Sequence, residues 1–137
     1  MRGVLDTNVL ISALLVGKST SAQLVTAWRR GMFELLTCKL QLEEVRAVTR
    51  RDSVRTLIRP ALAGEMINQL RDMAVWIEAL PRVDRSPDPF DNFLLAMAEG
   101  GGANVLVSGD KRGVLALKSH GACRIVTIRE FVGEMGL

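Results

Sequence analysis

Two short apolar runs, each followed by an aspartate, constrain the fold of this chain more than any other feature. Gly3 to Leu5 and Val105 to Val107 carry no charge, as expected of central strands that are buried on both faces. Asp6 follows the first run directly, and Asp110 follows the second after Ser108 and Gly109. Strands of this kind occur in parallel sheets that helices cover on both sides.

Stretches with helical periodicity alternate with these and other short apolar runs. The sequence predicts helices at 8–16, from about 20 to 30, 40–51, 61–75, 88–99 and 128–135, with further strands at 33–37, 76–83 and 124–127. Alternating strands and helices predict a three-layer α/β/α fold with a central parallel sheet, in one domain over residues 1–137.

Composition limits the class of protein. The chain has 137 residues, of which 48% are hydrophobic, so it is long enough to bury a core. Its isoelectric point of 9.3 favours an anionic partner. The apolar run Val9 to Val16 is too short to span a membrane, and Asp6 precedes it where a signal peptide would be positive. We therefore expect a cytoplasmic protein with no membrane association.

Two further acids lie beside the apolar face of their predicted helices. Glu44 stacks between Leu40 and Val48, and Asp91 shares a side with Leu94, Leu95 and Ala98. Each has a structural alternative: Glu44 could reach out to water, and Asp91 could cap the helix that Asp88-Pro89 begins. Capping would explain Asp88 completely.

Asp6 and Asp110 are harder to explain as turn or cap residues, although that alternative stays open for each. Ligands of open α/β sheets bind beyond the carboxyl ends of the strands, near the point where strand order reverses. Both aspartates follow strands at such ends. A carboxylate that points into a fold is costly unless something neutralises it.

Four converging carboxylates predict a hard divalent cation, Mg²⁺ or Mn²⁺, as the neutralising group. No histidine and cysteine cluster suggests zinc, and we expect His120 to lie in a surface loop. The sequence has neither a P-loop nor a serine nucleophile elbow. Cys38 and Cys123 share no motif spacing, which predicts buried reduced thiols.

Four segments together resemble the PIN domain, and among its members the VapC-like toxin ribonucleases of bacterial toxin–antitoxin systems. These segments are Leu5-Asp6-Thr7-Asn8-Val9-Leu10, Leu42-Glu43-Glu44-Val45, Asp88-Pro89-Phe90-Asp91-Asn92 and Val107-Ser108-Gly109-Asp110. They occur in the family's order over essentially the whole chain. The stretch after Asp110, which begins Lys111-Arg112, lacks the further acid that many relatives have there, so the number of metals stays open.

The resemblance implies specific roles. Asp6, Glu44, Asp91 and Asp110 match the acidic metal-binding quartet, Asn8 and Ser108 match positions that order the site, and Asp88 matches an outer contact. The implied activity is divalent-metal-dependent cleavage of single-stranded RNA. The implied partners are a cognate antitoxin protein and a second copy of the chain in a homodimer.

Basic residues suggest where RNA could bind. Arg46 and Arg50 share a helical face, and Lys111 and Arg112 directly follow Asp110. A solvated helix surface is the alternative for the first pair. Other functions also stay open: a catalytically inactive RNA- or protein-binding module of the same fold, a phosphatase, or a housekeeping nuclease that processes RNA or DNA.

Overall fold

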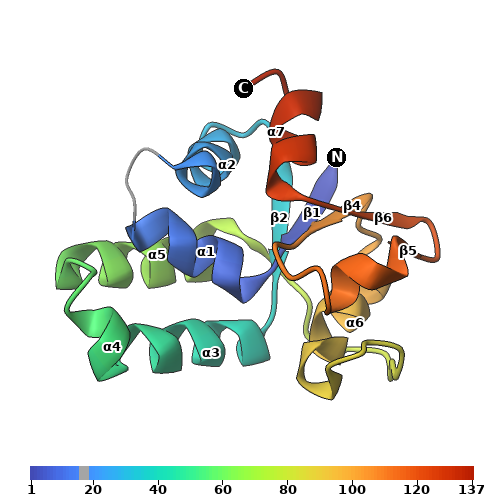
Figure 1. Ribbon diagram of the computed structural model, residues 1–137, viewed down its shortest axis with the longest axis horizontal. Coiled ribbons are helices and arrows are strands. Elements are labelled where there is room, and N and C mark those ends of the chain that lie inside the picture. Colours follow the sequence, from blue (N-terminus) through green and yellow to red (C-terminus); the bar gives the residue numbers. More distant parts are fainter. Residues whose placement is uncertain (16–18) are drawn as a thin grey trace.

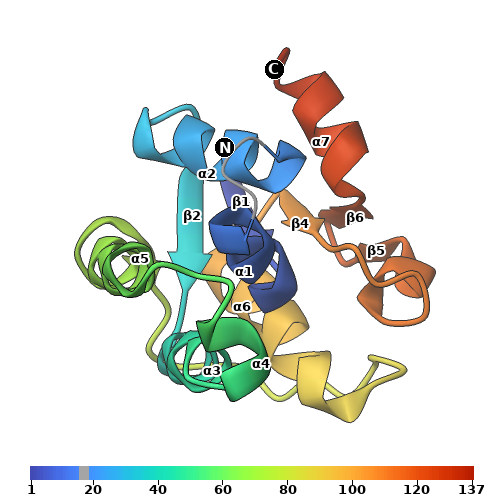
Figure 2. The ribbon, with the colours of Figure 1, turned by 60° about the vertical axis from the view of Figure 1, so that its left-hand side comes forward.

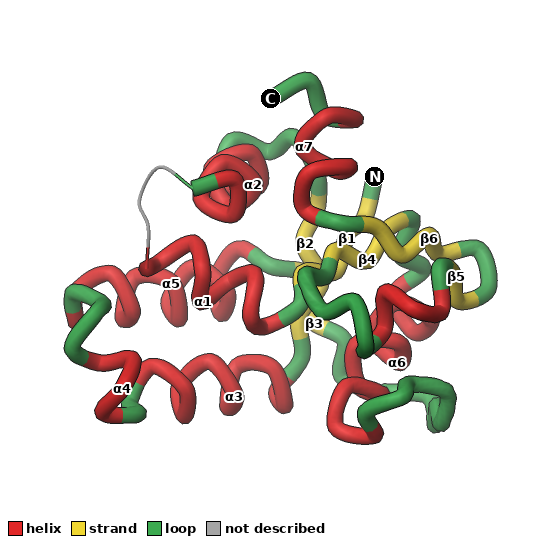
Figure 3. Tube along the Cα trace, viewed as in Figure 1, coloured by secondary structure: helices red, strands yellow, loops and turns green. Residues whose placement is uncertain are grey.

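A single sheet organises the chain. The computed structural model describes residues 1–15 and 19–137. Their strands form a six-stranded sheet in the order β3-β2-β1-β4-β6-β5, in which only β5 runs antiparallel to its neighbour. Figure 3 shows these strands at the centre, with helices around them. The strands are β1 (Arg2–Leu5), β2 (Glu34–Thr37), β3 (Val75–Trp76), β4 (Val105–Val107), β5 (Ser119–His120) and β6 (Cys123–Val126). The predicted α/β/α fold is confirmed.

The helices follow the predicted order closely. They are α1 (Thr7–Leu15), α2 (Thr20–Arg29), α3 (Lys39–Thr49), α4 (Asp52–Arg55), α5 (Pro60–Met73), α6 (Asn92–Gly101) and α7 (Ile128–Glu134), with 3-10 turns η1 (Pro89–Asp91) and η2 (Val114–Leu117). Ser19 caps α2 by accepting the amide of Ala22. The predicted end of the first helix at residues 16 and 17 lies outside the described residues.

Alternating side chains along the central strands create two apolar layers. Leu5, Leu35 and Val107 pack with α1, α2, α3, α5 and α7, whereas Val4 and Leu106 pack with α6 on the opposite face. Figures 1 and 2 show α6 on the side of the sheet away from α1. A fully buried Leu or Val contributes roughly 1.5–3 kcal/mol, so a register shift by one residue would be very costly.

The order of the sheet places a crevice next to Asp6. β1 lies between β2 and β4, and the chain leaves β1 toward β2 but returns later to β4 on the other side. Leu5 pairs with Val107 at the carboxyl ends of β1 and β4. The residues that follow them, Asp6 and Ser108, therefore stand side by side at the switch point where α/β proteins bind ligands.

Two details differ from the sequence-based predictions. The edge strand predicted over residues 76–83 is only Val75–Trp76, and most of the segment from there to Asp88 is irregular. The helix predicted to end at residue 99 continues as α6 through Gly101. A Cβ on Gly101 would meet the Leu36 side chain at 2.5 Å, so α6 packs on the sheet through this glycine, and Gly102, at φ 62°, ends the helix.

No single helix of the described residues is long and apolar enough to cross a membrane; α1 and α2 pass that test only as a pair, by length and composition, across a bend of 104°.

Candidate metal centre

Asp6 is the buried acid of the site. It is 5% exposed, directly after β1. One carboxylate oxygen accepts the Ser108 hydroxyl at 2.8 Å, and the other accepts the Asn8 amide at 3.2 Å. Burial raises the pKa of Asp6, and Asp110 raises it further, while the two hydrogen bonds lower it. Asp6 therefore also caps the start of α1, which was the structural alternative for this residue.

Ser108 connects Asp6 to Asp110. Its hydroxyl is fully buried, donates to Asp6 and accepts the Asp110 amide at 3.2 Å. Asp110 itself is exposed, and its carboxylate accepts the Arg112 amide at 3.0 Å. A Cβ on Gly113 would lie 2.7 Å from an Asp110 carboxylate oxygen, so only glycine leaves room for this side chain. These contacts fix Asp110 beside the end of β1.

Asp88 and Asp91 lie at the two ends of one 3-10 turn and behave differently. The Asp88 side chain accepts the Phe90 amide at 3.1 Å, so the predicted capping role of Asp88 is present. Asp91 precedes α6 but makes no side-chain cap hydrogen bond. The capping alternative therefore does not account for Asp91, which is half-buried just before a helix whose following residues are core.

Glu44 reaches the site from α3, and buried polar groups fix that helix against β1. The Gln41 side-chain amide donates to the Leu5 carbonyl at 2.8 Å, and the Thr37 hydroxyl donates to the Gln41 oxygen at 2.9 Å. All three residues are fully buried. Sequence analysis missed Gln41 and Thr37, although Gln41 lies three residues before Glu44, on the apolar side of α3. Their contacts set where Glu44 stands relative to Asp6.

The charges of these acids meet at Asp91. Its pKa is raised from 3.8 to about 6, first by burial and then by the charges of Asp6, Asp88, Glu44 and Asp110. No lysine or arginine of residues 1–15 and 19–137 lowers the pKa of Asp6 or Asp91. The structure thus brings the four predicted acids into one electrostatic environment with no basic side chain to offset them.

The donor set fits a hard divalent cation. Carboxylate oxygens are the ligands that Mg²⁺ and Mn²⁺ favour, and the Thr7 hydroxyl, adjacent to Asp6, is buried with no hydrogen-bond partner among the described residues. Within the same residues, no three acidic, histidine or cysteine side chains are close enough to enclose an ion as they stand. A shared ion would therefore require these side chains to draw closer together.

The predicted supporting and basic residues are divided between two places. Asn8 and Asp110 line an open depression of about 290 Å³ together with Val9, Ser12, Gly109 and Ile128. Lys111 lines a neighbouring depression of about 530 Å³ together with Lys118 and Arg124. Arg46 and Arg50 lie on α3 two and six residues after Glu44, which turns both away from the face that Glu44 occupies. The structure brings Lys111 and Arg112, but not this pair, next to the acids.

Comparison with known proteins identifies the family. The sequence model of the PIN domain matches residues 2–112. The chain belongs to the PIN domain family. PIN domains are generally nucleases. No curated protein sequence matches the chain significantly.

A solved structure shows the same fold. A chain of VapBC2 from Rickettsia felis, crystallised bound to a DNA fragment from their promoter, has a TM-score of 0.58 to this PIN domain with 10% sequence identity. The similarity covers 93% of this chain and 98% of that chain. At this identity the likeness establishes the fold, which agrees with the sheet and helices described above.

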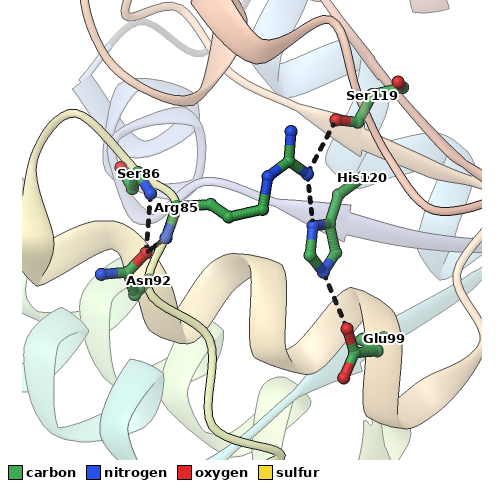
Figure 4. Close-up of polar contacts among 6 residues, drawn as sticks. All are labelled: Arg85, Ser86, Asn92, Glu99, Ser119 and His120. Atoms are coloured by element: carbon green, nitrogen blue, oxygen red, sulfur yellow. Dashed lines mark hydrogen bonds and ion pairs between the residues drawn. The ribbon is translucent and has the colours of Figure 1, made fainter.

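A polar network holds the loop that leads into Asp88 of this PIN domain (Figure 4). The Asn92 side chain accepts the amides of Arg85 and Ser86 at 3.0 and 2.8 Å. The Arg85 guanidinium donates to the Ser119 carbonyl and to Nδ1 of His120 at 2.7 Å, and Nε2 of His120 lies 3.0 Å from Glu99. The contacts anchor the loop to α6 and β5.

The prediction that His120 lies in a surface loop is wrong. It belongs to β5, and its side chain is only 9% exposed. The hairpin to β6 turns at Gly121, which has φ 57°. Glycine at the first of two central turn positions is typical of a tight hairpin, so Gly121-Ala122 was the signal for this strand. His120 serves as a bridge between α6 and the loop.

Proposed function

We propose that this chain is a divalent-metal-dependent endoribonuclease that cleaves single-stranded RNA, with residues 1–137 forming one nuclease domain in the cytoplasm. The observation that carries the proposal is the convergence of carboxylates at the carboxyl ends of β1 and β4, where Ser108 hydrogen-bonds both Asp6 and the Asp110 amide. Burial, and then the charges of Asp6, Asp88, Glu44 and Asp110, raise the pKa of Asp91 in the same place. An acidic centre of this kind at a sheet switch point favours a bound cation over a structural ion-pair network.

We assign Asp6, Asp91 and Asp110 as ligands of Mg²⁺ or Mn²⁺. A bound ion of this type lowers the pKa of a coordinated water and neutralises charge on a scissile phosphate. Ser108 holds one oxygen of Asp6 in place, while the Arg112 amide and the small Gly113 orient Asp110. Whether one or two ions bind stays open.

Glu44 and Asn8 complete the proposed site. Glu44 makes no hydrogen bond or ion pair to any of the described residues, so its carboxylate is available to orient a water or to complete the ligand set. The Asn8 side chain borders the depression that Asp110 also lines, where it can hydrogen-bond a substrate oxygen. Asp88 contributes a further negative charge near Asp91 while it caps η1.

Lys111 and Arg112 offer the nearest positive charges to an RNA backbone. Both are exposed and directly follow Asp110. Lys118, which lines the depression beside them, would extend this track away from the acids, whereas Arg124 in the same lining is paired with Glu134. Arg46 and Arg50 stay a prediction for more distant contacts, because their face of α3 is turned from Glu44.

The similarity to a chain of VapBC2, a protein pair bound to its promoter, supports a toxin role with a cognate antitoxin. We extend this to a homodimer, as the sequence resemblance implies. A small upstream gene for a DNA-binding protein would support the toxin assignment, whereas its absence would favour housekeeping RNA processing.

Acid-to-amide variants test the catalytic assignment. Asp6→Asn and Asp110→Asn should each abolish Mn²⁺-dependent cleavage of single-stranded RNA, with circular dichroism spectra like that of the wild type. Asp52→Asn is the matched control, because Asp52 is an exposed acid on α4 paired with Arg55, and it should retain full activity. Retained activity in either site variant would overturn the assignment of that residue.

The same assay separates the alternatives. Parallel reactions with single-stranded DNA and a small phosphate ester distinguish an endoribonuclease from a DNA-processing nuclease or a phosphatase. A wild-type protein that binds RNA but cuts none of these substrates with Mg²⁺ or Mn²⁺ would instead be an inactive binding module.

A further inference from the structure

Phe90 is the most exposed large apolar side chain of the described residues. It is 87% exposed, in the middle of the turn that carries Asp88 and Asp91. An aromatic ring gains most of its stabilisation by burial, and this ring contributes almost none to the core. Sequence analysis considered neither packing nor binding for Phe90.

The backbone beneath the ring is held at several points. The Phe90 amide donates to the Asp88 side chain at 3.1 Å, and the Asp91 amide donates to the Asp88 carbonyl at 3.0 Å. Pro89 fixes the first position of the turn. The loop before it is tied to Asn92 and, through Arg85, to β5 (Figure 4). The ring is therefore presented on a fixed support.

The ring stands at the edge of the acidic centre. Phe90 lies between Asp88 and Asp91 in the chain. Asp91 is close enough to Asp6, Glu44 and Asp110 for their negative charges to act on its carboxyl group. Phe90 is the residue directly before Asp91, so a nucleotide next to a phosphate held by these acids could reach its ring. Nucleobases stack on exposed aromatic rings whatever their sequence, because every base has a π-face.

Phe90 is the only strongly exposed large apolar residue of η1, α6 and the loop from 78 to 88, all of which lie within the described residues. Protein-binding surfaces are contiguous apolar patches of several hundred Å², and a single ring on an acidic turn is not one. The isolated ring favours a nucleobase over a protein as its occupant.

We propose that Phe90 is a stacking platform for a nucleobase of the RNA substrate beside the scissile phosphate, and that it positions the strand in the acidic centre. This inference rests on the proposed ribonuclease function. Because stacking holds the substrate in both its ground state and its transition state, loss of the ring acts mainly on KM.

Variants of Phe90 test the role of the ring. With an RNA oligonucleotide cut at one mapped position, Phe90→Ala should lower kcat/KM roughly 5- to 150-fold, chiefly through KM. Phe90→Leu keeps an apolar side chain without a π-face, so it should lower kcat/KM almost as much as Phe90→Ala. Phe90→Trp keeps a π-face and should have a kcat/KM close to that of the wild type. Leu57→Ala, which removes a 65% exposed apolar side chain between α4 and α5, is the matched control and should leave kcat/KM unchanged.

A cycle with abasic RNA isolates the contact itself. A single abasic ribonucleotide is placed in turn at each position flanking the cut. At one position it should weaken cleavage by the wild type as much as Phe90→Ala does, and should have no further effect on Phe90→Ala. Additive losses at every position, or a Phe90→Ala variant with wild-type kinetics, would overturn the inference. Equal losses on normal and abasic RNA with a changed oligomeric state would assign Phe90 to a protein interface instead.

Failure of the inference and failure of the proposed function have different signatures. Wild-type protein that cuts RNA independently of Phe90 overturns the stacking role alone. Wild-type protein that binds but does not cut RNA overturns the ribonuclease proposal, and the same cycle read by fluorescence anisotropy then decides the stacking role. Protein that neither binds nor cuts RNA overturns both.

Discussion

Ser108 counteracts the burial of Asp6. The Asp6 carboxylate is 5% exposed, and the hydroxyl of the fully buried Ser108 is the side-chain donor that favours its charged form. Hydrogen bonds to charged groups contribute more than those between neutral groups, because the alternative is an unpaired charge in a medium of low polarity. The same hydroxyl accepts the Asp110 amide, so a single side chain orders two of the acids.

Ser108→Ala should therefore cost about 1–3 kcal/mol of the free energy of unfolding at pH 7.5, and should also reduce cleavage activity. Urea denaturation measures the first effect. Ser53→Ala, at an exposed position of α4, is the control and should stay within about 0.5 kcal/mol of the wild type. An equally small change for Ser108→Ala would show that the hydroxyl does not sustain the Asp6 charge.

Asp91 makes stability depend on pH with a defined sign. Its pKa of about 6 lies above the ordinary 3.8, so between these values the folded state binds more protons than the unfolded chain. Stability then decreases as pH rises from about 4 to about 6, and this contribution is constant at higher pH.

Asp91→Asn removes that penalty. Without added metal and with a chelator present, the variant should melt above the wild type at pH 7.5, by roughly 2–6 °C, and close to it at pH 4. The difference between the two proteins isolates Asp91 from the other acids. Thermal denaturation at both pH values is the measurement, and a variant that melts below the wild type at pH 7.5 would contradict the electrostatic account.

At the scale of elements, α3 is positioned by polar contacts inside the fold. Gln41 accepts the Thr37 hydroxyl at the end of β2 and donates to the Leu5 carbonyl at the end of β1. These contacts join the carboxyl ends of two strands to the first turn of α3. Glu44 follows one turn later, so the placement of this acid depends on groups that do not touch the depression.

Gln41→Leu keeps the volume of the side chain but leaves Thr37 and the Leu5 carbonyl without partners. We expect it to destabilise the fold by about 1–3 kcal/mol. We also expect it to lower kcat while changing KM little. Gln23→Leu, at an exposed position of α2, controls for the substitution and should leave both unchanged. The outcome that would count against a positioning role is a destabilised Gln41→Leu variant with wild-type kinetics at a temperature where both proteins are folded.

Local sequence signals predicted most helices and strands. They failed where the structure of a residue depends on contacts with residues far away in the sequence. Apolar runs and helical periodicity located β1, β4 and α3 within one or two residues. Asp88-Pro89, predicted to begin the α-helix, instead begins the 3-10 turn η1, and α6 starts only at Asn92. Nothing local shows that Gly101 must be glycine, because the reason is its packing on Leu36. The burial of His120 likewise depends on Arg85 and Glu99, which are far from it in sequence.

The candidate site shows the same division. Asp6 and Asp110 could be placed from the sequence, because the carboxyl ends of adjacent parallel strands meet at one edge of a sheet. Asp91 could not be separated from a capping residue by sequence, and the structure shows that its side chain makes no cap bond. The orientation of Arg46 and Arg50 relative to the acids required the packed position of α3.

For the molecule as a whole, charge is distributed unevenly. The chain has a formal charge of +3, yet acids gather at the carboxyl ends of the strands without a basic partner among the described residues. Lys111 and Lys118 instead line the neighbouring depression, together with Glu130 and the ion-paired Arg124. This arrangement keeps the proposed cation site free of competing ammonium groups, while Lys111 and Lys118 nearby would attract a polyanion.

The most direct test of the central claim is the anomalous scattering of Mn²⁺ in crystals of the wild-type protein. The account predicts a manganese peak within bonding distance of carboxylate oxygens from Asp6, Asp91 and Asp110, and no such peak in crystals of Asp6→Asn. Manganese bound only elsewhere on the surface, or no peak at a concentration of Mn²⁺ that supports RNA cleavage, would contradict it.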